Sequence, residues 1–392
     1  MTPIYLDHSA TTPVDPRVVD AMLPYFTEVY GNASSGHAFG RDAEKAIEDA
    51  RETIAGVLNC QPHEIIFTGC GSESDNLAVR GAAWAGRRSG KGKHLITTPI
   101  EHGAIGKTVE QLAQFQGFES TILPVDGCGT VSVDEFRAAC RPTTTVASVI
   151  YANNEVGTIQ PIAALAAAAH GRSVLFHTDA VQAAGQLDLD VQRLGVDLLS
   201  ISGHKFYGPK GVGALYVRDG VNLIPAQTGG GHERGLRAGT HNTPLIVGLA
   251  AALKLAYDEL AERTAYYQSL RDQLITGILS AISTAQLTGH PEHRLSSHAS
   301  FVFEGLENFD LLGQLNEQGI AASAASACKT GNTQPSSVLL ALGYGPELAS
   351  SSLRLTVGLH TTQSEIDCTV ETLARIICNL PQTTPLTAVP VA

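Results

Sequence analysis

The 392-residue sequence predicts an α/β fold, with a large domain on a mostly parallel seven-stranded sheet and a smaller α+β domain. Short apolar runs alternate with helical patterns from about residue 60 to 225, which is typical of a parallel sheet covered by helices. A long helical pattern then leads into a stretch where strands and helices are mixed. The length suffices for two domains with large cores.

Seven apolar runs are expected to form the sheet, with helical patterns between them. The expected strands cover residues 64–68, 94–98, 121–124, 146–151, 173–178, 198–202 and 214–217, and the helical patterns 72–86, 104–115, 162–170 and 191–194. Ligands of such sheets bind beyond the carboxyl ends of the strands. Five candidate functional residues come directly after strands: Ser72, His102, Asn154, Asp179 and Lys205.

The last third of the chain predicts the smaller domain. A helical pattern from residue 243 to about 280, with Pro244 in its first turn, is expected to cross from one domain to the other. Strands are expected at 300–303 and 352–356. We therefore predict a large domain at 15–260, a small domain formed by 1–14 and 261–380, and a frayed tail at 381–392.

Charge and composition exclude several classes of partner. The net charge of −12 argues against nucleic acid or an anionic membrane, because both would repel the protein. The first seven residues show no signal-peptide pattern. The longest apolar stretch, 245–257, is interrupted by Lys254 and is shorter than the roughly 20 residues of a membrane span. We expect a cytoplasmic protein.

The seven cysteines are widely spaced and form no CxxC pair. An odd number without such pairs predicts free thiols in a reducing compartment, and no metal site is expected. Cys60, Cys140, Cys368 and Cys378 lie in segments that look helical or apolar, so we expect them to be small buried side chains.

Lys205 and Asp179 predict the chemistry. Lys205 follows the apolar run 196–201 and is surrounded by hydroxyl, imidazole and glycine, which suits Schiff-base formation with an aldehyde. Asp179 ends the apolar run 174–178. Pyridoxal phosphate requires both an imine-forming lysine and a carboxylate that keeps its ring nitrogen protonated. As an alternative, Asp179 is an ordinary helix N-cap.

Residues 69–74 read Gly-Cys-Gly-Ser-Glu-Ser between a strand and a helix. Gly71 and Ser72 therefore predict a phosphate cradle built on backbone amides and a hydroxyl. Ser202 and His204, beside the lysine, support this interpretation, whereas Ser72 alone would favour a simple N-cap. Gln182, three residues after Asp179, is placed to donate to a ring oxygen of the cofactor. His102 is a candidate for stacking and proton transfer, although a lone histidine is more often structural.

Two further residues predict substrate chemistry. Cys328 lies in a small, polar segment beside Lys329, which predicts a reactive thiolate on a flexible loop. Arg354 lies in an expected strand and could bind a carboxylate through two hydrogen bonds, as an amino-acid substrate requires. The alternative for Arg354 is a surface ion pair.

Together these segments resemble the cysteine desulfurases of the NifS/IscS type, in the aspartate-aminotransferase (fold type I) superfamily. The resemblance extends from residue 4 to about 380. Its most specific pieces are 4–13, 73–76, 153–157, 202–211 and 229–240, and the cysteine segment followed by 335–339. The resemblance implies pyridoxal 5′-phosphate as cofactor, L-cysteine as substrate and a homodimer.

The resemblance also implies a role for each candidate. Lys205 would hold the cofactor and move the Cα proton, and Cys328 would attack the substrate sulfur, leaving a persulfide and releasing alanine. The implied ring ligands are Asp179, Gln182 and a stacked His102, and the implied phosphate ligands are Ser72, Ser202, His204 and the partner subunit's Thr240. Asn154 and Arg354 would hold the substrate carboxylate.

The sequence departs from the family pattern in three places. Ser72 replaces the usual threonine but keeps the hydroxyl, residues 69–71 read Gly-Cys-Gly where Ser-Gly-Ala is usual, and the Cys328 segment is about one residue longer than in the housekeeping enzymes. The sulfur acceptor, such as an iron–sulfur scaffold protein, therefore stays open. Two other functions remain possible: a related lyase for cysteine, cystine or selenocysteine that needs no enzyme thiol, and a docking scaffold for sulfur acceptors. An aminotransferase is disfavoured because it has no use for the thiol.

Overall fold

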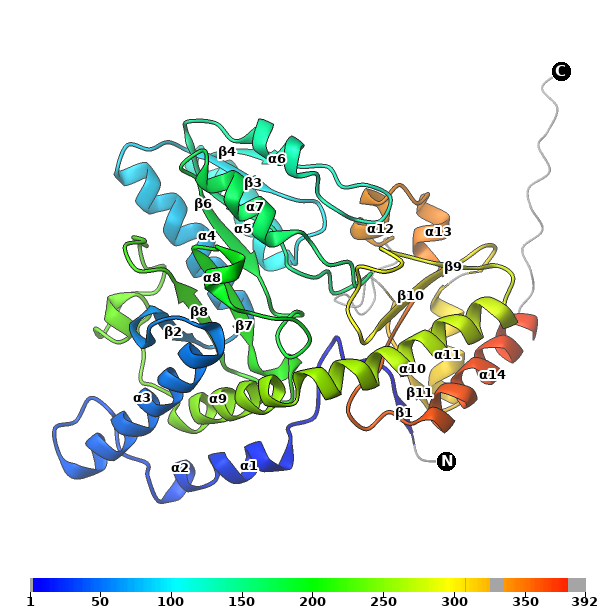
Figure 1. Cartoon of the computed structure of the whole chain (residues 1–392), viewed down its shortest axis with the longest axis horizontal. Helices are drawn as coiled ribbons and strands as arrows, with labels where there is room; N and C mark the ends of the chain where they lie inside the picture. The colour runs from blue at the N-terminus through cyan, green and yellow to red at the C-terminus, as the bar shows by residue number, and fades with distance from the viewer. Residues whose placement is uncertain (1–2, 307, 325–334, 380–392) are drawn as a thin grey trace.

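The computed structural model describes residues 3–306, 308–324 and 335–379, and a seven-stranded sheet forms its centre (Figure 1). The strands are β2 (Ile65–Thr68), β3 (His94–Thr97), β4 (Glu119–Ile122), β5 (Thr144–Ser148), β6 (Leu175–Asp179), β7 (Leu198–Ser202) and β8 (Gly213–Val217). Their order is β2-β8-β7-β6-β5-β3-β4, in which β8 is antiparallel to both neighbours and the other pairs are parallel. The predicted α/β fold with a mostly parallel sheet is confirmed.

Helices cover both faces of the sheet because its strands are apolar on both faces. The covering helices are α3 (Ala38–Leu58), α4 (Gly71–Arg88), α5 (Gly103–Gln116), α6 (Val133–Ala139), α7 (Ile162–His170), α8 (Val191–Leu194) and α9 (Thr243–Asp258). Helices α4 and α5 share a core with Ile66 and Leu95. Helices α3, α7 and α9 share the opposite core with Phe67 and Phe176. Successive residues of one strand, such as Ile66 and Phe67, thus pack against helices on opposite faces of the sheet.

A smaller unit is built around an antiparallel sheet in the order β12-β10-β9. Its elements are β9 (Ala285–Leu287), β10 (His298–Phe303), β12 (Ser352–Thr356), α10 (Leu260–Ala281), α11 (Asn308–Glu317), α12 (Ser337–Ala341), α13 (Pro346–Ser350) and α14 (Gln363–Asn379). Near the N-terminus, β1 (Ile4–Tyr5) pairs in parallel with β11 (Ile320–Ala321), so the start of the chain joins this unit. The predicted domain boundaries stay a prediction.

The long helical pattern is divided into two helices that meet near Glu259. The backbone of Glu259 leaves helical geometry (φ −99°, ψ 10°), so α9 ends at Asp258 and α10 begins at Leu260. Pro244 lies in the first turn of α9, as predicted. Two short helices, α1 (Pro16–Met22) and α2 (Pro24–Thr27), lead into α3. Figure 1 shows α9 and α10 following one another beneath both units.

The expected burial of the four cysteines is correct for Cys140 and wrong for Cys378, which is exposed near the end of α14. Cys60 and Cys368 are partly buried. An amphipathic helix such as α14 buries one face only, and Cys378 lies on the other face. Among the helices of the described residues, none has the length and apolar character to cross a membrane.

Candidate active site

Lys205 lies at the carboxyl end of β7, in a short 3-10 turn, η2 (Gly203–Lys205). Its Nζ atom donates to the backbone oxygens of Ser9 (2.7 Å) and Ala10 (2.8 Å). The side chain is partly buried. A segment from the start of the chain therefore positions the predicted lysine from a distance of almost two hundred residues.

Asp179 ends β6, the strand beside β7, and is 3% exposed. Its Oδ1 atom accepts a hydrogen bond of 2.9 Å from the backbone of Val181. Burial raises the pKa of Asp179, whereas that hydrogen bond and the charges of His102 and Lys205 act to lower it. No helix follows, because residues 181–186 form turns, so Asp179 is not an N-cap. A buried carboxyl group near the lysine is the arrangement that the sequence predicted.

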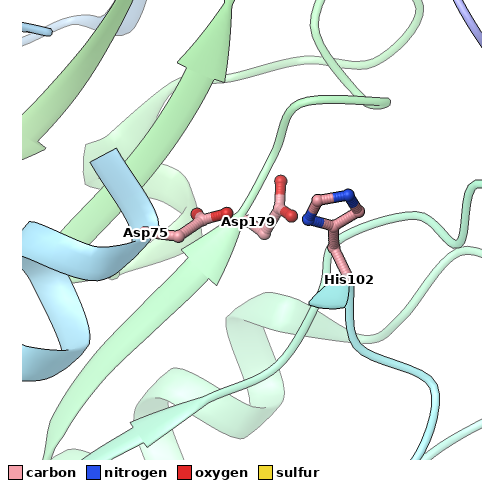
Figure 2. A group of neighbouring side chains, drawn as sticks. All are labelled: Asp75, His102 and Asp179. Atoms are coloured by element: carbon pink, nitrogen blue, oxygen red, sulfur yellow. The ribbon is translucent and has the colours of Figure 1, made fainter. Parts of the chain in front are cut away.

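Three side chains from three different elements converge at this point. One ligand atom each of Asp75, His102 and Asp179 lies within 4.8 Å of the others. Figure 2 shows Asp179 between Asp75, which comes from α4, and His102, which begins α5. His102 caps α5, since its Nδ1 accepts from the backbone of Ala104 (3.2 Å). Asp75 was given no role from the sequence; its only signal was its place in 73–76, one of the specific pieces of the family resemblance.

The first turn of α4 packs closely against Val181, two residues after Asp179, and against Ser202 at the end of β7. A Cβ atom on Gly71 would lie 2.8 Å from Val181 Cγ2 and 3.2 Å from Ser202 Cβ, so only glycine allows this approach. Ser202 is buried and Ser72 is exposed at the opening. Cys70, and not Ser72, precedes the helix, and its side chain accepts no hydrogen bond from the first turn. The N-cap interpretation of Ser72 is therefore wrong.

His204 and Gln182 bond to the N-terminal segment. His204 Nδ1 shares a hydrogen bond of 3.2 Å with Thr11 Oγ1, and Gln182 Nε2 donates to Ser9 O at 2.9 Å. Burial, with the nearby charges of Lys205 and Lys210, lowers the pKa of His204 to about 4. His204 is therefore neutral at pH 7 and can serve a phosphate as a hydrogen-bond donor, not as a cation.

Arg354 is buried, not part of a surface ion pair, and it links three segments. Its Nη1 donates to Asn154 O (2.9 Å) and its Nη2 to Asp7 Oδ1 (2.8 Å). Asn154 O also accepts from Ser9 Oγ (3.1 Å). The predicted carboxylate ligands Asn154 and Arg354 therefore lie together, beside the segment that also contacts the lysine.

The segment Asp7–Thr12 is the part of the site that the sequence analysis did not assign. It supplies partners for Lys205, Gln182, His204 and Arg354. Its residues have no apolar periodicity, so pattern analysis gave no signal. The only signal was its place among the most specific pieces of the family resemblance.

Two predicted residues are not brought into this cluster. Thr240 is exposed on the loop after β8, beyond η3 (Glu233–Gly235). Cys328 lies outside the described residues. The neighbours of its segment are described: Ser323 forms a bridge with Arg354, and Ser336 Oγ donates to Glu155 Oε2 at 2.6 Å.

The residues present fit pyridoxal phosphate. A buried carboxyl group suits the ring nitrogen, an amine at the end of the neighbouring strand suits the aldehyde, and the glycine-lined start of α4 suits the phosphate. The Gly71 contacts show that a side chain at this position would fill the cradle. His102 and Asp179 are thus accounted for as walls of one organic cofactor site.

Comparison with known proteins agrees with this geometry. The family model described as aminotransferase class-V matches residues 4–368. The cysteine desulfurase IscS of Methanosarcina thermophila is 48% identical over 384 residues, covering 98% of this chain and 94% of the relative. That of Methylobacillus flagellatus is 45% identical, with 98% and 95% covered. A solved NifS-like protein superposes with a TM-score of 0.90 at 36% identity, covering 97% of this chain and all of that one.

Proposed function

The chain belongs to the aminotransferase class-V family, and we propose that it is a pyridoxal-phosphate-dependent cysteine desulfurase converting L-cysteine to L-alanine. The observation that carries this proposal is that Lys205 and Arg354 are held by one N-terminal segment, with the buried Asp179 at the end of the strand beside that of Lys205. This cluster combines an amine, a ring acid and a carboxylate fork, which an enzyme acting on amino acids needs. The full-length similarity to cysteine desulfurases supports the choice of substrate.

When bound, the cofactor supplies an electron sink for the bonds at the amino-acid Cα atom. We propose that Lys205 Nζ holds the cofactor and afterwards moves the Cα proton. Asp179 would keep the proton of the ring nitrogen in place, while Gln182 would donate to the ring oxygen and His102 would stack on the ring. The start of α4 at Gly71 and Ser72, with Ser202 and His204, would bind the phosphate.

Substrate orientation is assigned to Arg354 and Asn154. Within the described residues, the Nε atom of Arg354 has no hydrogen-bond partner, although the side chain is 3% exposed. An arginine fork with unused donor capacity suits a carboxylate.

Cys328 is proposed as the sulfur acceptor within the enzyme. The thiolate attacks the substrate sulfur, the carbon–sulfur bond breaks with its electrons going to the substrate carbon, and a persulfide stays on Cys328. The anchors on either side support this assignment, because Ser323 pairs with Arg354 and Ser336 bonds Glu155, next to Asn154. We propose that the persulfide supplies sulfur for iron–sulfur cluster assembly or other thio-cofactors, through an acceptor protein.

A homodimer is proposed on the strength of an exposed apolar patch. Several large apolar side chains between α1 and the start of α3 are 40–65% exposed: Val19, Leu23, Phe26, Tyr30 and Phe39. The rings of Tyr30 and Phe39 lie 5.7 Å apart, and exposed apolar side chains that gather in this way support an interaction site. The proposal includes the partner subunit's Thr240 as a phosphate ligand, and the mass in solution tests it. We also propose a cytoplasmic location, supported by the unpaired state of the described cysteines.

A single-turnover reaction tests the function. The purified yellow protein is mixed with L-cysteine without reductant, followed by intact-mass analysis and peptide mapping. We expect one added sulfur on Cys328 and one alanine released. The matched variant Cys328→Ala should keep the visible absorption of the cofactor but form no persulfide. Pyruvate, ammonia and sulfide with unmodified Cys328 would indicate a lyase, and no product with bound cofactor would indicate a docking scaffold.

A further inference from the structure

Asp75 is a buried acid with no role in the chemistry described above. It lies near the start of α4 and is 1% exposed. Its Oδ1 atom has no hydrogen-bond partner among the described residues. The nearest basic nitrogen, His177 Nε2, lies 3.7 Å away, beyond hydrogen-bonding distance. A charged carboxylate in this position would have the hydroxyl group of Ser200 as a hydrogen-bond donor but no partner for Oδ1, which is less than a buried charge requires.

Two histidines face Asp75: His102, with a ring nitrogen within 4.8 Å, and His177. His177 of β6 shares its two ring nitrogens with the hydroxyl groups of Ser148 (2.8 Å) and Ser200 (2.9 Å), and burial lowers its pKa to about 3. His177 is therefore neutral at pH 7. The other ionisable groups that act on Asp75 are the acidic side chains of Asp179, Glu101 and Cys70. Burial and the charge of Asp179 both raise the pKa of Asp75.

Asp179 differs from Asp75 in having partners for a negative charge. It accepts from the backbone of Val181 at 2.9 Å, and the charge of Lys205 acts on it, whereas no lysine or arginine acts on Asp75. The acidic groups of Asp75 and Asp179 lie within 4.8 Å of each other, and both side chains are buried. Two such carboxyl groups do not both ionise, and the proton stays on the one with fewer partners.

We propose that Asp75 is a positioning residue whose protonated carboxyl group forms the polar wall behind Asp179, leaving Asp179 as the single carboxylate that faces the cofactor ring nitrogen. Figure 2 shows the basis for this: Asp179 lies between Asp75 on one side and His102 on the other. The inference rests on cofactor binding from the proposed function, but not on L-cysteine as substrate.

Infrared spectroscopy of the full-length holoenzyme tests the protonation state directly. The spectrum of Asp75→Asn is subtracted from that of the wild-type protein at pH 7. We expect the difference to contain the carbonyl band of one protonated carboxylic acid, shifted in heavy water. A difference containing carboxylate bands would overturn the proposal. If the asparagine variant does not fold, Asp75→Leu gives the same comparison.

Cofactor titration tests the positioning role with a matched pair of substitutions. Because an amide resembles a neutral acid, Asp75→Asn should change the dissociation constant of pyridoxal phosphate less than about threefold, whereas Asp179→Asn should weaken binding at least about tenfold. Asp75→Leu, which removes the polar wall, should bind about three- to tenfold more weakly than Asp75→Asn and shift the visible absorption. Equal losses in both asparagine variants, or no difference between the two Asp75 variants, would overturn it. Loss of desulfurase activity alone would not affect these readouts.

Discussion

Two buried arginines of this protein each pair with a carboxylate, but they differ in how completely they are satisfied. Arg51 of α3 donates both Nη atoms to Glu233 at 2.9 Å, Nη1 also to Ile65 O at 2.7 Å, and Nε to Glu48 at 3.2 Å. Its guanidinium also lies 4.7 Å from the centre of the Phe67 ring. All three nitrogen atoms of this guanidinium donate hydrogen bonds within the fold.

Arg354 is equally buried but keeps unused capacity. It makes one hydrogen bond to Asp7 and one to Asn154 O, and its Nε atom lacks a partner among the residues that the structure describes. Asp7 is 18% exposed, whereas Glu233 is 1% exposed in its side chain. The comparison of Arg51 with Arg354 indicates that burial alone does not distinguish a structural charge from a functional one. A fully satisfied pair holds the fold, and an incompletely satisfied one is available to a ligand.

The largest effect is expected at the satisfied pair. Arg51→Met leaves Glu233 buried without its main partner, so the free energy of unfolding should fall by about 3–5 kcal/mol. Denaturant unfolding followed by circular dichroism measures this. The control is Glu48→Gln, which removes the partly exposed partner of the same arginine and should cost less than about 1 kcal/mol. Similar losses of stability in Arg51→Met and Glu48→Gln would show that the contact with Glu233 is not the main contribution of Arg51.

Lowering the pH should weaken the ion pair of Arg51 and Glu233 before it affects contacts between neutral groups. Burial alone would raise the pKa of Glu233, but hydrogen bonds from Arg51 and His241 lower it to about 2. Since an unfolded glutamate has a pKa of about 4.3, the contribution of the pair is complete above that pH and is lost as pH falls through about 2. The difference between the unfolded and folded pKa values corresponds to about 3 kcal/mol in the free energy of unfolding.

Urea unfolding of wild-type protein and Glu233→Gln at pH values from 5 to below 3 checks this expectation. The wild-type protein should lose the additional stability over this range, and the glutamine variant should lack that part of the pH dependence. Parallel pH curves for the two proteins would contradict the assignment of this titration to Glu233.

Much of this site was predictable because strand ends are visible in the sequence. Lys205 and Asp179 each terminate an apolar run, and parallel neighbouring strands bring such ends together. The N-terminal partners were not predictable in the same way, because Asp7 and Ser9 contact residues up to 347 positions away and belong to no periodic pattern. Asp75 was hidden for a different reason: its helix is amphipathic, and a polar residue in the first turns gives no indication of which face it lies on.

The smallest effect in stability, and the sharpest test of the comparison, is expected at Arg354. Arg354→Lys keeps the positive charge but removes the planar fork, so kcat/KM for L-cysteine should fall about 10- to 100-fold, which equals about 1.4–2.8 kcal/mol. The free energy of unfolding should change by less than about 1 kcal/mol, because the partly exposed Asp7 stays solvated.

The matched control is Arg51→Lys, which makes the same chemical change at the satisfied pair. It should lower stability more than Arg354→Lys does, because a lysine cannot replace the two parallel bonds to Glu233. Arg354→Lys should therefore lower kcat/KM with little loss of stability, whereas the main effect of Arg51→Lys should be a loss of stability. If Arg354→Lys lowered stability and left kcat/KM unchanged, Arg354 would be a structural residue of the same kind as Arg51, and the carboxylate of the substrate would have to be bound elsewhere.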